Sequence, residues 1–524
     1  MDAGDGIAAL PVFGSWGGDA ADAARRANDR LRVDLDAQGN ESLAVATAAR
    51  TAADDMQRVK AELAQLEADV NNSRGAWRID PASSRVVPGP NPRVPLTVAV
   101  SEGGQLQARL TAILAEAARV DDELASAIKM ATGAAPLPSS PHDLRPEILD
   151  ALSRPLPTDP KQFHDLWEQL TREEKDWLYQ QNHFIGNQGG MPSADRDVYN
   201  RMNLADLMQA NQTELERLRA AHPDWADGKN QPMIDPQFPT APDWPTWKEQ
   251  WANANRARSE YQQLQQALQS PDGLPRFLGT FSNDGRAAVS INNPDFAKRD
   301  VTFVPGTGQD LSHLSGSTLK SSRMLDATLQ MDPSLRPGDV SVTTWMGYDR
   351  PMNLLEAANV SYADNGAQAL DDFQAGIRAS HNDLAAGGPS LNTVIGHSYG
   401  STVVGDAALC GHHLDANNVV AVGSPGVLAG HASDFSLAPG AHFFATRAEN
   451  DIIAWATDTN LGVDPMAANF GGIPFEAAPG PTGSIGLESV AAHSTYWDYG
   501  NPALINMRRI IDGRLDVTPP TFTP

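Results

Sequence analysis

The sequence predicts an α/β fold in the C-terminal half of the chain, built on a mostly parallel sheet, with all-α regions before it. From residue 275 onward, short and nearly continuous apolar runs alternate with helical stretches, which is typical of a parallel sheet covered by helices on both faces. Nearer the N-terminus, apolar residues recur at spacings of three and four, as on one face of a helix. A stretch rich in proline and serine at 133–160 interrupts these helical patterns and is typical of a linker.

The length of the chain indicates several domains. At 524 residues it exceeds the size at which a single hydrophobic core stops growing, so we expect two or three domains. The predicted division is a helical hairpin module at 1–132, the linker at 133–160, a helical and partly irregular middle region at 161–274, the α/β domain at 275–516 and a tail at 517–524.

The first module is predicted to be two packed helices with a short β-hairpin at 76–87 between them. Each helix has one apolar face, formed by Met56, Val59, Leu63, Leu66 and Val70 in the first, and by Leu106, Leu110, Ile113, Ala117, Val120, Leu124 and Ile128 in the second. Two such helices should pack as an antiparallel pair. The module is either a plain helical hairpin or a docking surface, and the sequence leaves both interpretations open.

The middle region contains short amphipathic helices and a stretch at 222–244 rich in proline and tryptophan. A further helix is expected from the spacing of Trp247, Trp251, Tyr261 and Leu264. Its aromatic side chains either pack in a core or form the apolar underside of a cap over a site. We favour packing over a ligand cage for these tryptophans, and treat the region as a possible cap.

The α/β domain is predicted to contain seven strands and four helices. The expected strands are residues 276–281, 287–291, 301–304, 340–345, 391–395, 418–422 and 442–445. The expected helices are residues 319–329, 363–386, 399–410 and 502–511.

Composition excludes several classes of function. A formal net charge of −25 without a basic stripe disfavours nucleic-acid binding. The single cysteine, Cys410, excludes an internal disulfide and a zinc site built from cysteines, and we expect it to be a small buried apolar residue. The adjacent His412 and His413 cannot both face one ion, and no other metal-ligand spacing stands out, so we expect neither a metal nor a cofactor.

The sequence shows neither a basic and apolar leader in its first thirty residues nor a run of eighteen apolar residues. We therefore expect a chain without a transmembrane segment, located in the cytoplasm or secreted by a leaderless route.

A serine stands in a pattern that predicts a sharp turn between a strand and a helix. The pentapeptide Gly396-His397-Ser398-Tyr399-Gly400 follows the apolar run 391–395 and precedes the predicted helix. Such a turn needs small residues two before and two after the serine, because a side chain there would collide with neighbouring backbone. The pattern predicts a nucleophile elbow with Ser398 as the nucleophile, its hydroxyl raised above the sheet edge.

A serine nucleophile needs a base within hydrogen-bond reach. In this arrangement an acid and then a histidine follow the serine along the chain. The downstream histidines are His412, His413, His431, His442 and His493. Position favours His493, which lies in a late loop between the last predicted strand and the terminal helix. His397, beside the nucleophile, is expected to pack behind the elbow instead of transferring protons.

The acid should follow the strand at 442–445. Both Glu449 and Asp451 are available there, and we choose Asp451 because the apolar residues after it imply that its carboxylate turns inward. Asp458 and Asp464 are expected to be solvated surface charges.

Donors for a developing oxyanion are expected from two places. One is the backbone N–H of Tyr399, the residue after the nucleophile, and the other is the loop Pro305-Gly306-Thr307-Gly308 after an early strand. We assign the role to Gly306, Thr307 and Tyr399. The loop lacks the Gly-Lys-Ser/Thr ending of a phosphate-binding loop, so that interpretation is set aside.

Several motifs together resemble a known family, the actinobacterial α/β-hydrolases catalogued as domain of unknown function 1023. They cover about residues 276–513 and are Pro305–Gly308, Trp345–Tyr348, Gly396–Thr402, Val422–Gly426, Ala448–Asp451 and His493–Asp498. Residues 185–187, Pro192, Arg196-Asp197 and Asn200 look like the segment that commonly precedes that domain. The resemblance implies an α/β-hydrolase fold with a triad of Ser398, Asp451 and His493, and leaves the substrate open.

The N-terminal segment Phe13–Ala21 resembles the Trp-x-Gly turn of type VII secretion substrates, although almost nothing precedes it that could form the first helix of such a pair. Two functions are therefore weighed. The first is a serine hydrolase of the esterase or lipase type that acts on an acyl ester, a thioester or a lipid. The second is a type VII secretion-associated effector whose helical module binds a secretion partner and whose hydrolase domain is its cargo.

Overall fold

The computed structural model divides the chain into two compact units, Met1–Leu149 and Asp150–Pro524. The residues that it describes are parts of 56–120, then 155–232, 243–270, 272–353, 356–456, 460–483 and 488–522. The predicted Trp-x-Gly segment, most of the predicted linker and Asp458 lie outside the described residues.

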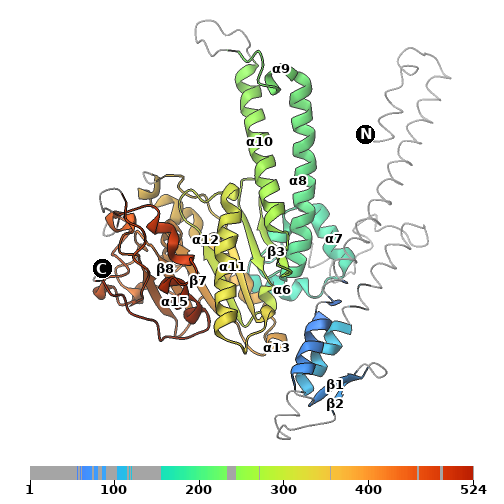
Figure 1. Cartoon of the computed structure of the whole chain (residues 1–524). Coiled ribbons are helices and arrows are strands. Elements are labelled where there is room, and N and C mark those ends of the chain that lie inside the picture. Colours follow the sequence, from blue (N-terminus) through green and yellow to red (C-terminus); the bar gives the residue numbers. More distant parts are fainter. Residues whose placement is uncertain are drawn as a thin grey trace, which may run out of the picture. The chain divides into compact units, whose positions relative to one another are not determined.

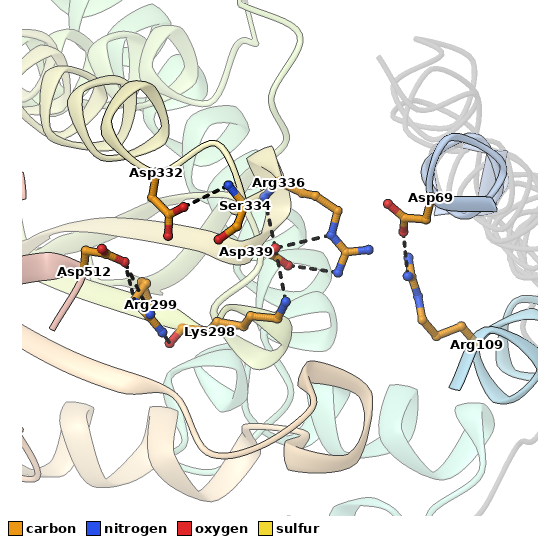
Figure 2. A network of polar contacts seen from close by, with 9 residues as sticks. All are labelled: Asp69, Arg109, Lys298, Arg299, Asp332, Ser334, Arg336, Asp339 and Asp512. Atoms are coloured by element: carbon orange, nitrogen blue, oxygen red, sulfur yellow. Dashed lines mark hydrogen bonds and ion pairs between the residues drawn. The ribbon is translucent and has the colours of Figure 1, made fainter. Parts of the chain in front are cut away.

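The described part of the first unit contains the predicted β-hairpin and the facing apolar stripes of the two helices. Strand β1 (Trp77–Asp80) pairs antiparallel with β2 (Arg85–Pro88). Residues of both stripes form one apolar cluster that includes Leu66, Val70, Leu106 and Leu110. An ion pair of 2.7 Å between Arg109 and Asp69 joins the two helices (Figure 2). Packing of the two stripes against each other is therefore confirmed where the structure describes them.

The second unit is built on an eight-stranded sheet with the order β10-β9-β8-β7-β5-β6-β4-β3. Its strands are β3 (Arg276–Phe281), β4 (Ala287–Ile291), β5 (Arg299–Val304), β6 (Val340–Met346), β7 (Leu391–His397), β8 (Asn418–Val422), β9 (His442–Thr446) and β10 (Ile473–Pro474). Strand β4 pairs antiparallel with both β3 and β6, and the remaining pairs are parallel. All seven predicted strands are confirmed. The two-residue β10, which contains a proline, was missed.

Helices cover both faces of this sheet (Figure 1). One face carries α11 (Leu314–Met331) and α15 (Pro502–Ile511), which pack on each other over a core containing Phe303, Val420 and Phe444. The other face carries α12 (Ser361–Ser380) and α14 (Tyr399–Asp406) over a second core. The central strands are buried along almost their whole length because both of their faces are covered.

Two predicted helices end earlier than expected. The predicted helix 363–386 is broken at His381 and Asn382 into α12 and the short α13 (Asp383–Ala386), where the Asn382 side chain caps α13. The helix predicted at 399–410 ends at Asp406. Cys410, which was expected to be its last residue, has a left-handed backbone (φ 54°) and is followed by Gly411. Cys410 is therefore exposed at a turn, and the prediction of a buried small residue is wrong.

The middle region begins with α6 (Pro160–Trp167) and α7 (Arg172–Gln181) and then follows the outer edge of the sheet. Helix α8 (Ser193–Ala221) packs along the edge strand β3. The Asn187 side chain bonds both backbone groups of Phe281, and Asp197 accepts from the backbone N–H of Leu278. Side-chain amides and a carboxylate thus satisfy the edge strand where another strand would otherwise pair.

The distal part of α8, the short α9 (Pro223–Ala226) and α10 (Trp244–Ala267) form a helical hairpin (Figure 1). Its aromatic cluster consists of Trp225, Trp244, Trp247 and Trp251, with ring centroids 5.3 Å apart for Trp247 and Trp251. The Ser315 hydroxyl, just after the start of α11, donates to Gln263. Along α10, Trp244 lies about 28 Å from Gln263, at 1.5 Å of rise per residue, so the tryptophan end of the helix is far from this contact with α11. The described contacts of these tryptophans lie within the hairpin, which favours the packing interpretation.

Ion pairs join the elements at the amino end of the parallel strands, opposite the predicted site (Figure 2). Asp339 accepts from Arg336 and Lys298, and Arg299 pairs with Asp512 after the last helix. These contacts tie the starts of β5 and β6 to neighbouring segments.

Asp300 is a buried acid near the start of β5. Neither of its carboxyl oxygens has a hydrogen-bond partner among the described residues. Burial raises the pKa of Asp300 to about 7, and the nearby Ser341 hydroxyl and Arg378 lower it by less. The folded state therefore keeps a proton between pH 4 and 7 that the unfolded state releases, so stability falls as the pH rises through this window.

We expect Asp300→Asn to gain stability relative to wild type as the pH rises from 5 to 8, because an amide does not ionise. At about 1.4 kcal/mol per pKa unit, the relative change in unfolding free energy is on the order of 3 kcal/mol. Urea unfolding of both proteins at pH 5 and pH 8 measures it. An equal difference between the two proteins at both pH values would contradict the prediction.

Candidate active site

Ser398 occupies the predicted turn between β7 and α14, with a left-handed backbone at φ 55° and ψ −133°. The glycines two residues before and two after Ser398 have no room for a side chain. A Cβ on Gly396 would lie 2.4 Å from the Cα of Ser401, and a Cβ on Gly400 would lie 2.1 Å from the carbonyl oxygen of Val304. The strand, turn and helix predicted from the pentapeptide are therefore present, with the small residues where the turn needs them.

His493 lies in the 3₁₀ helix η11 (Ala492–Trp497), and its Nδ1 is 2.8 Å from Oδ2 and 2.9 Å from Oδ1 of Asp451. The Asp451 carboxylate is fully buried, whereas Glu449 is exposed. A carboxylate only accepts, so the Nδ1–H of His493 donates to it and Nε2 is left to face other groups. Of the two acids that the sequence offered, Asp451 is the one that contacts the histidine.

Two further donors reach the Asp451 carboxylate. The backbone N–H of Ile453 donates to Oδ1 at 2.9 Å, and the hydroxyl of Tyr496 donates to Oδ2. That hydroxyl also accepts from the backbone N–H of Ala448 at 3.1 Å. Tyr496 was not predicted as a site residue, although it stands three residues after His493 in the same 3₁₀ helix. Burial and the neighbouring carboxylate raise the pKa of Tyr496 well above 10, so its hydroxyl stays protonated and can donate.

The serine and the His493–Asp451 pair meet at the carboxyl end of the parallel strands. The backbone N–H of Ser398 donates to the carbonyl of Val422, the last residue of β8. The next residue, Gly423, has φ 53°, and a Cβ there would lie 3.1 Å from Oδ2 of Asp451 and 3.2 Å from Cε1 of His493. The end of β8 therefore touches both the elbow and the pair.

The three residues predicted to bind an oxyanion lie around the elbow. A Cβ on Gly306 would lie 2.8 Å from the Cβ of Ser398 and 2.9 Å from the backbone nitrogen of Tyr399. Thr307 follows in the same loop, half-buried, whereas the N–H of Gly308 donates to the carbonyl of Pro351. Tyr399 is the first residue of α14, where an N–H has no partner within the helix. The loop after β5 thus lies directly over the start of α14.

The remaining acids and histidines that the sequence singled out have other contacts. Asp464 is buried and pairs with the buried Arg447 at 2.6 Å, so the expectation of a solvated surface charge is wrong for it. Arg447 is itself buried and pairs with a carboxylate in the interior. Its pairing with Asp464 joins residues 17 positions apart, so the local sequence does not show it. His412 lies 3.5 Å from Asp371, and His413 and His431 contact serine hydroxyls. In the described part of the chain no cluster of histidines, cysteines and acids suits a metal ion.

Family models match two parts of the chain. A model described as an alpha/beta hydrolase matches residues 282–461, and a model described as "Uncharacterised protein Rv0964c" matches residues 11–160. The C-terminal domain has the α/β-hydrolase fold. Its sheet, helices and strand–turn–helix around Ser398 are the elements of that fold, with the helical regions before it.

Curated relatives come from mycobacteria. The chain is 28% identical over 428 residues to "Uncharacterized protein Rv2079" of Mycobacterium tuberculosis, covering 72% of this chain and 59% of that protein. It is 29% identical over 211 residues to "Uncharacterized protein Rv0963c" of the same species, covering 39% of this chain and 77% of that protein. The chain thus spans 59% of the length of the first of these relatives.

Among solved structures, the crystal structure of esterase PE8 is similar with a TM-score of 0.22 at 16% identity, covering 31% of this chain and 75% of that one. A lipase-esterase related protein from Clostridium acetobutylicum matches with a TM-score of 0.15 at 16% identity, covering 27% of this chain and 47% of that one. Among the helices that the structure describes, none combines the length and the apolar composition that a membrane span requires.

Replacing Tyr496 by phenylalanine should destabilise the hydrolase domain, because it removes one donor to the buried Asp451 carboxylate and leaves the N–H of Ala448 without its acceptor. We expect the free energy of unfolding to fall by roughly 1.5–3 kcal/mol, as for hydrogen bonds to charged groups. Urea unfolding at pH 7 measures it. Tyr348→Phe is the matched control, since the Tyr348 hydroxyl donates to the neutral carbonyl of Pro305, and it should cost about 1 kcal/mol. An equal loss of unfolding free energy in the two variants would contradict a charged acceptor for the Tyr496 hydroxyl.

Proposed function

We propose that this protein is a serine hydrolase that cleaves a carboxylic ester or thioester through an acyl-enzyme on Ser398. The single observation that carries the proposal is the buried contact between Asp451 and His493, at the sheet edge where Ser398 occupies its strained turn. The match to the alpha/beta hydrolase family model supports a hydrolase. No metal or cofactor is needed for the steps that follow.

The reaction proceeds by two acyl transfers. His493 Nε2 takes the proton of the Ser398 hydroxyl as Oγ bonds to the substrate carbonyl carbon, and the carbonyl oxygen becomes an oxyanion. When the tetrahedral intermediate collapses, the bond to the alcohol or thiol breaks and His493 gives its proton to that leaving group. Water then repeats the sequence on the acyl-enzyme, releasing the acid and restoring the serine.

The groups around Ser398 and His493 assist these steps. Asp451 holds the Nδ1–H tautomer of His493 and stabilises the imidazolium that forms. The backbone N–H groups of Gly306 or Thr307, with that of Tyr399, bind the oxyanion. The start of α14 adds its positive dipole end at the same place.

The surroundings of the site favour an apolar acyl substrate or a lipid. Trp455, four residues after Asp451, is 66% exposed, and Val490, three residues before His493, is 65% exposed. Met352, which follows the carbonyl that accepts from Gly308, is 50% exposed. We propose that these three side chains form one apolar surface beside the site, because contiguous exposed apolar patches mark ligand-binding or membrane-facing surfaces. Esters and thioesters are preferred over amides because their leaving groups depart more easily.

The alternative function, a type VII secretion-associated effector, stays a prediction. It depends on the segment around Trp16, which lies outside the described residues, and on a secretion partner for the helical module. The same holds for the family name, domain of unknown function 1023, and for the predicted domain boundaries. Within the unit Asp150–Pro524 we propose that the middle region and the hydrolase domain act as one body.

A fluorophosphonate probe should label Ser398, and Ser398→Ala should lose both labelling and ester hydrolysis, with turnover falling by roughly 10³-fold or more. Gel detection of the label and hydrolysis of a p-nitrophenyl acetate ester measure the two effects. Asp451→Asn should fall by a similar order, since Asp451 is the acid that contacts His493 whereas Glu449 is exposed. Glu449→Gln is the control and should be as active as wild type. Full activity of Ser398→Ala would refute the serine hydrolase.

Shortening the helical hairpin tests whether the middle region caps the site. Residues 213–252 are replaced by a short glycine-rich turn, which removes the tryptophan cluster and keeps the contact of 3.0 Å between Asn211 and the carbonyl of Ala254. Because the described contacts of the cluster lie within the hairpin, we expect unchanged hydrolysis of acetate and long-chain esters and an unchanged melting temperature. A changed chain-length preference in a folded variant would instead establish a cap.

A further inference from the structure

His397 is a buried histidine beside the nucleophile that the proposed reaction does not use. Its Nε2 lies 2.9 Å from the carbonyl oxygen of His493, 96 residues later in the chain. A carbonyl oxygen only accepts, so Nε2 carries the hydrogen and donates it. Nδ1 is then unprotonated, and it is buried without a partner among the residues that the structure describes.

We propose that His397 is a positioning residue that holds the backbone of His493 at a fixed place relative to Ser398. The inference rests on the proposed function of those two residues. His397 is the last residue of β7 and is joined to Ser398 by one peptide bond, so its hydrogen bond connects the nucleophile's segment directly to the carbonyl of the base. Asp451 fixes the ring of His493 from one side, and His397 fixes its main chain from the other.

The surroundings keep this histidine in the donating tautomer. Its ring is nearly perpendicular to that of Trp497, with centroids 4.9 Å apart at 87°, and is tilted by 32° to the ring of His493, with centroids 4.7 Å apart. The ammonium of Lys320 lies 4.6 Å from the centroid of Trp497. Burial, and after it the charges of Lys320 and His493, lower the pKa of His397 well below 6.5. A second proton would place an N–H at Nδ1, where the described residues offer no acceptor.

The same geometry rules out His397 as the general base. Its Nε2 is engaged as a donor to His493, and its Nδ1 is buried in the protein interior, so neither nitrogen can accept the proton of Ser398. The effect of His397 on the reaction is therefore carried through the position of His493. A misplacement of about 1 Å in a catalytic group can cost roughly 100-fold in rate.

The test compares two substitutions in the full-length chain. His397→Gln keeps an amide N–H with a similar reach, and His397→Leu removes the donor at similar volume. With p-nitrophenyl acetate, we expect kcat of the leucine variant to fall about 10- to 100-fold with little change in KM, and kcat of the glutamine variant to stay within about 3-fold of wild type. Equal activity of the leucine variant and wild type would overturn the proposal. Equal losses in both variants would also overturn it, because packing alone would then explain them.

A second measurement needs no variant and no turnover. In wild-type protein labelled with ¹⁵N-histidine, the ring of His397 should show a protonated Nε2 and a bare Nδ1 from pH 5 to pH 9 by NMR. The opposite tautomer, or titration of this ring within that range, would overturn the proposal even if the variants fail to fold. Failure of the proposed function looks different: wild type would then neither turn over the ester nor label at Ser398, whatever the tautomer of His397.

Discussion

The left-handed backbone of Ser398 is the constraint on which the rest of the site depends. Such a conformation costs a non-glycine residue about 1–3 kcal/mol and persists only where the surroundings hold it. Here the holding contacts are close approaches of backbone: Gly400 against Val304, Gly396 against Ser401, and Gly306 against the elbow itself. Because any side chain at these glycines would meet backbone atoms, the turn cannot relax without moving β5, β7 and α14 together.

The buried Asp451 carboxylate is the second costly group at this edge. An isolated charge in the interior is unfavourable by several kcal/mol unless it is hydrogen-bonded. Its donors come from His493, Tyr496 and Ile453, so the loop after β9 and the turn η11 converge on one charge. The hydrogen bond that helps to stabilise the buried Asp451 carboxylate also orients the ring of His493. The stability of this part of the fold and the geometry of the site therefore depend on the same contacts.

The sequence predicted the features that depend on local pattern. The seven strands follow from apolar runs, and the elbow follows from two glycines around Ser398. Asp451 was distinguished from Glu449 because apolar residues follow it. The predictions that were wrong or incomplete concern residues whose environment is set by the folded structure. Cys410 is exposed because a left-handed turn ends the helix early, and Asp464 is buried because Arg447 pairs with it. Tyr496 was missed because its role appears only once Asp451 is folded against it.

The edge of the sheet shows why the family match and the folding unit differ in extent. The alpha/beta hydrolase model matches from residue 282, yet the outermost strand β3 lies before that point. Its backbone groups bond the side chains of Asn187, Asp197 and Asn200, on a segment about eighty to ninety residues earlier. Without that segment, β3 would present unpaired N–H and C=O groups along an apolar edge, which favours pairing with other chains. The middle region therefore protects the sheet edge of the hydrolase domain, whatever else its hairpin does.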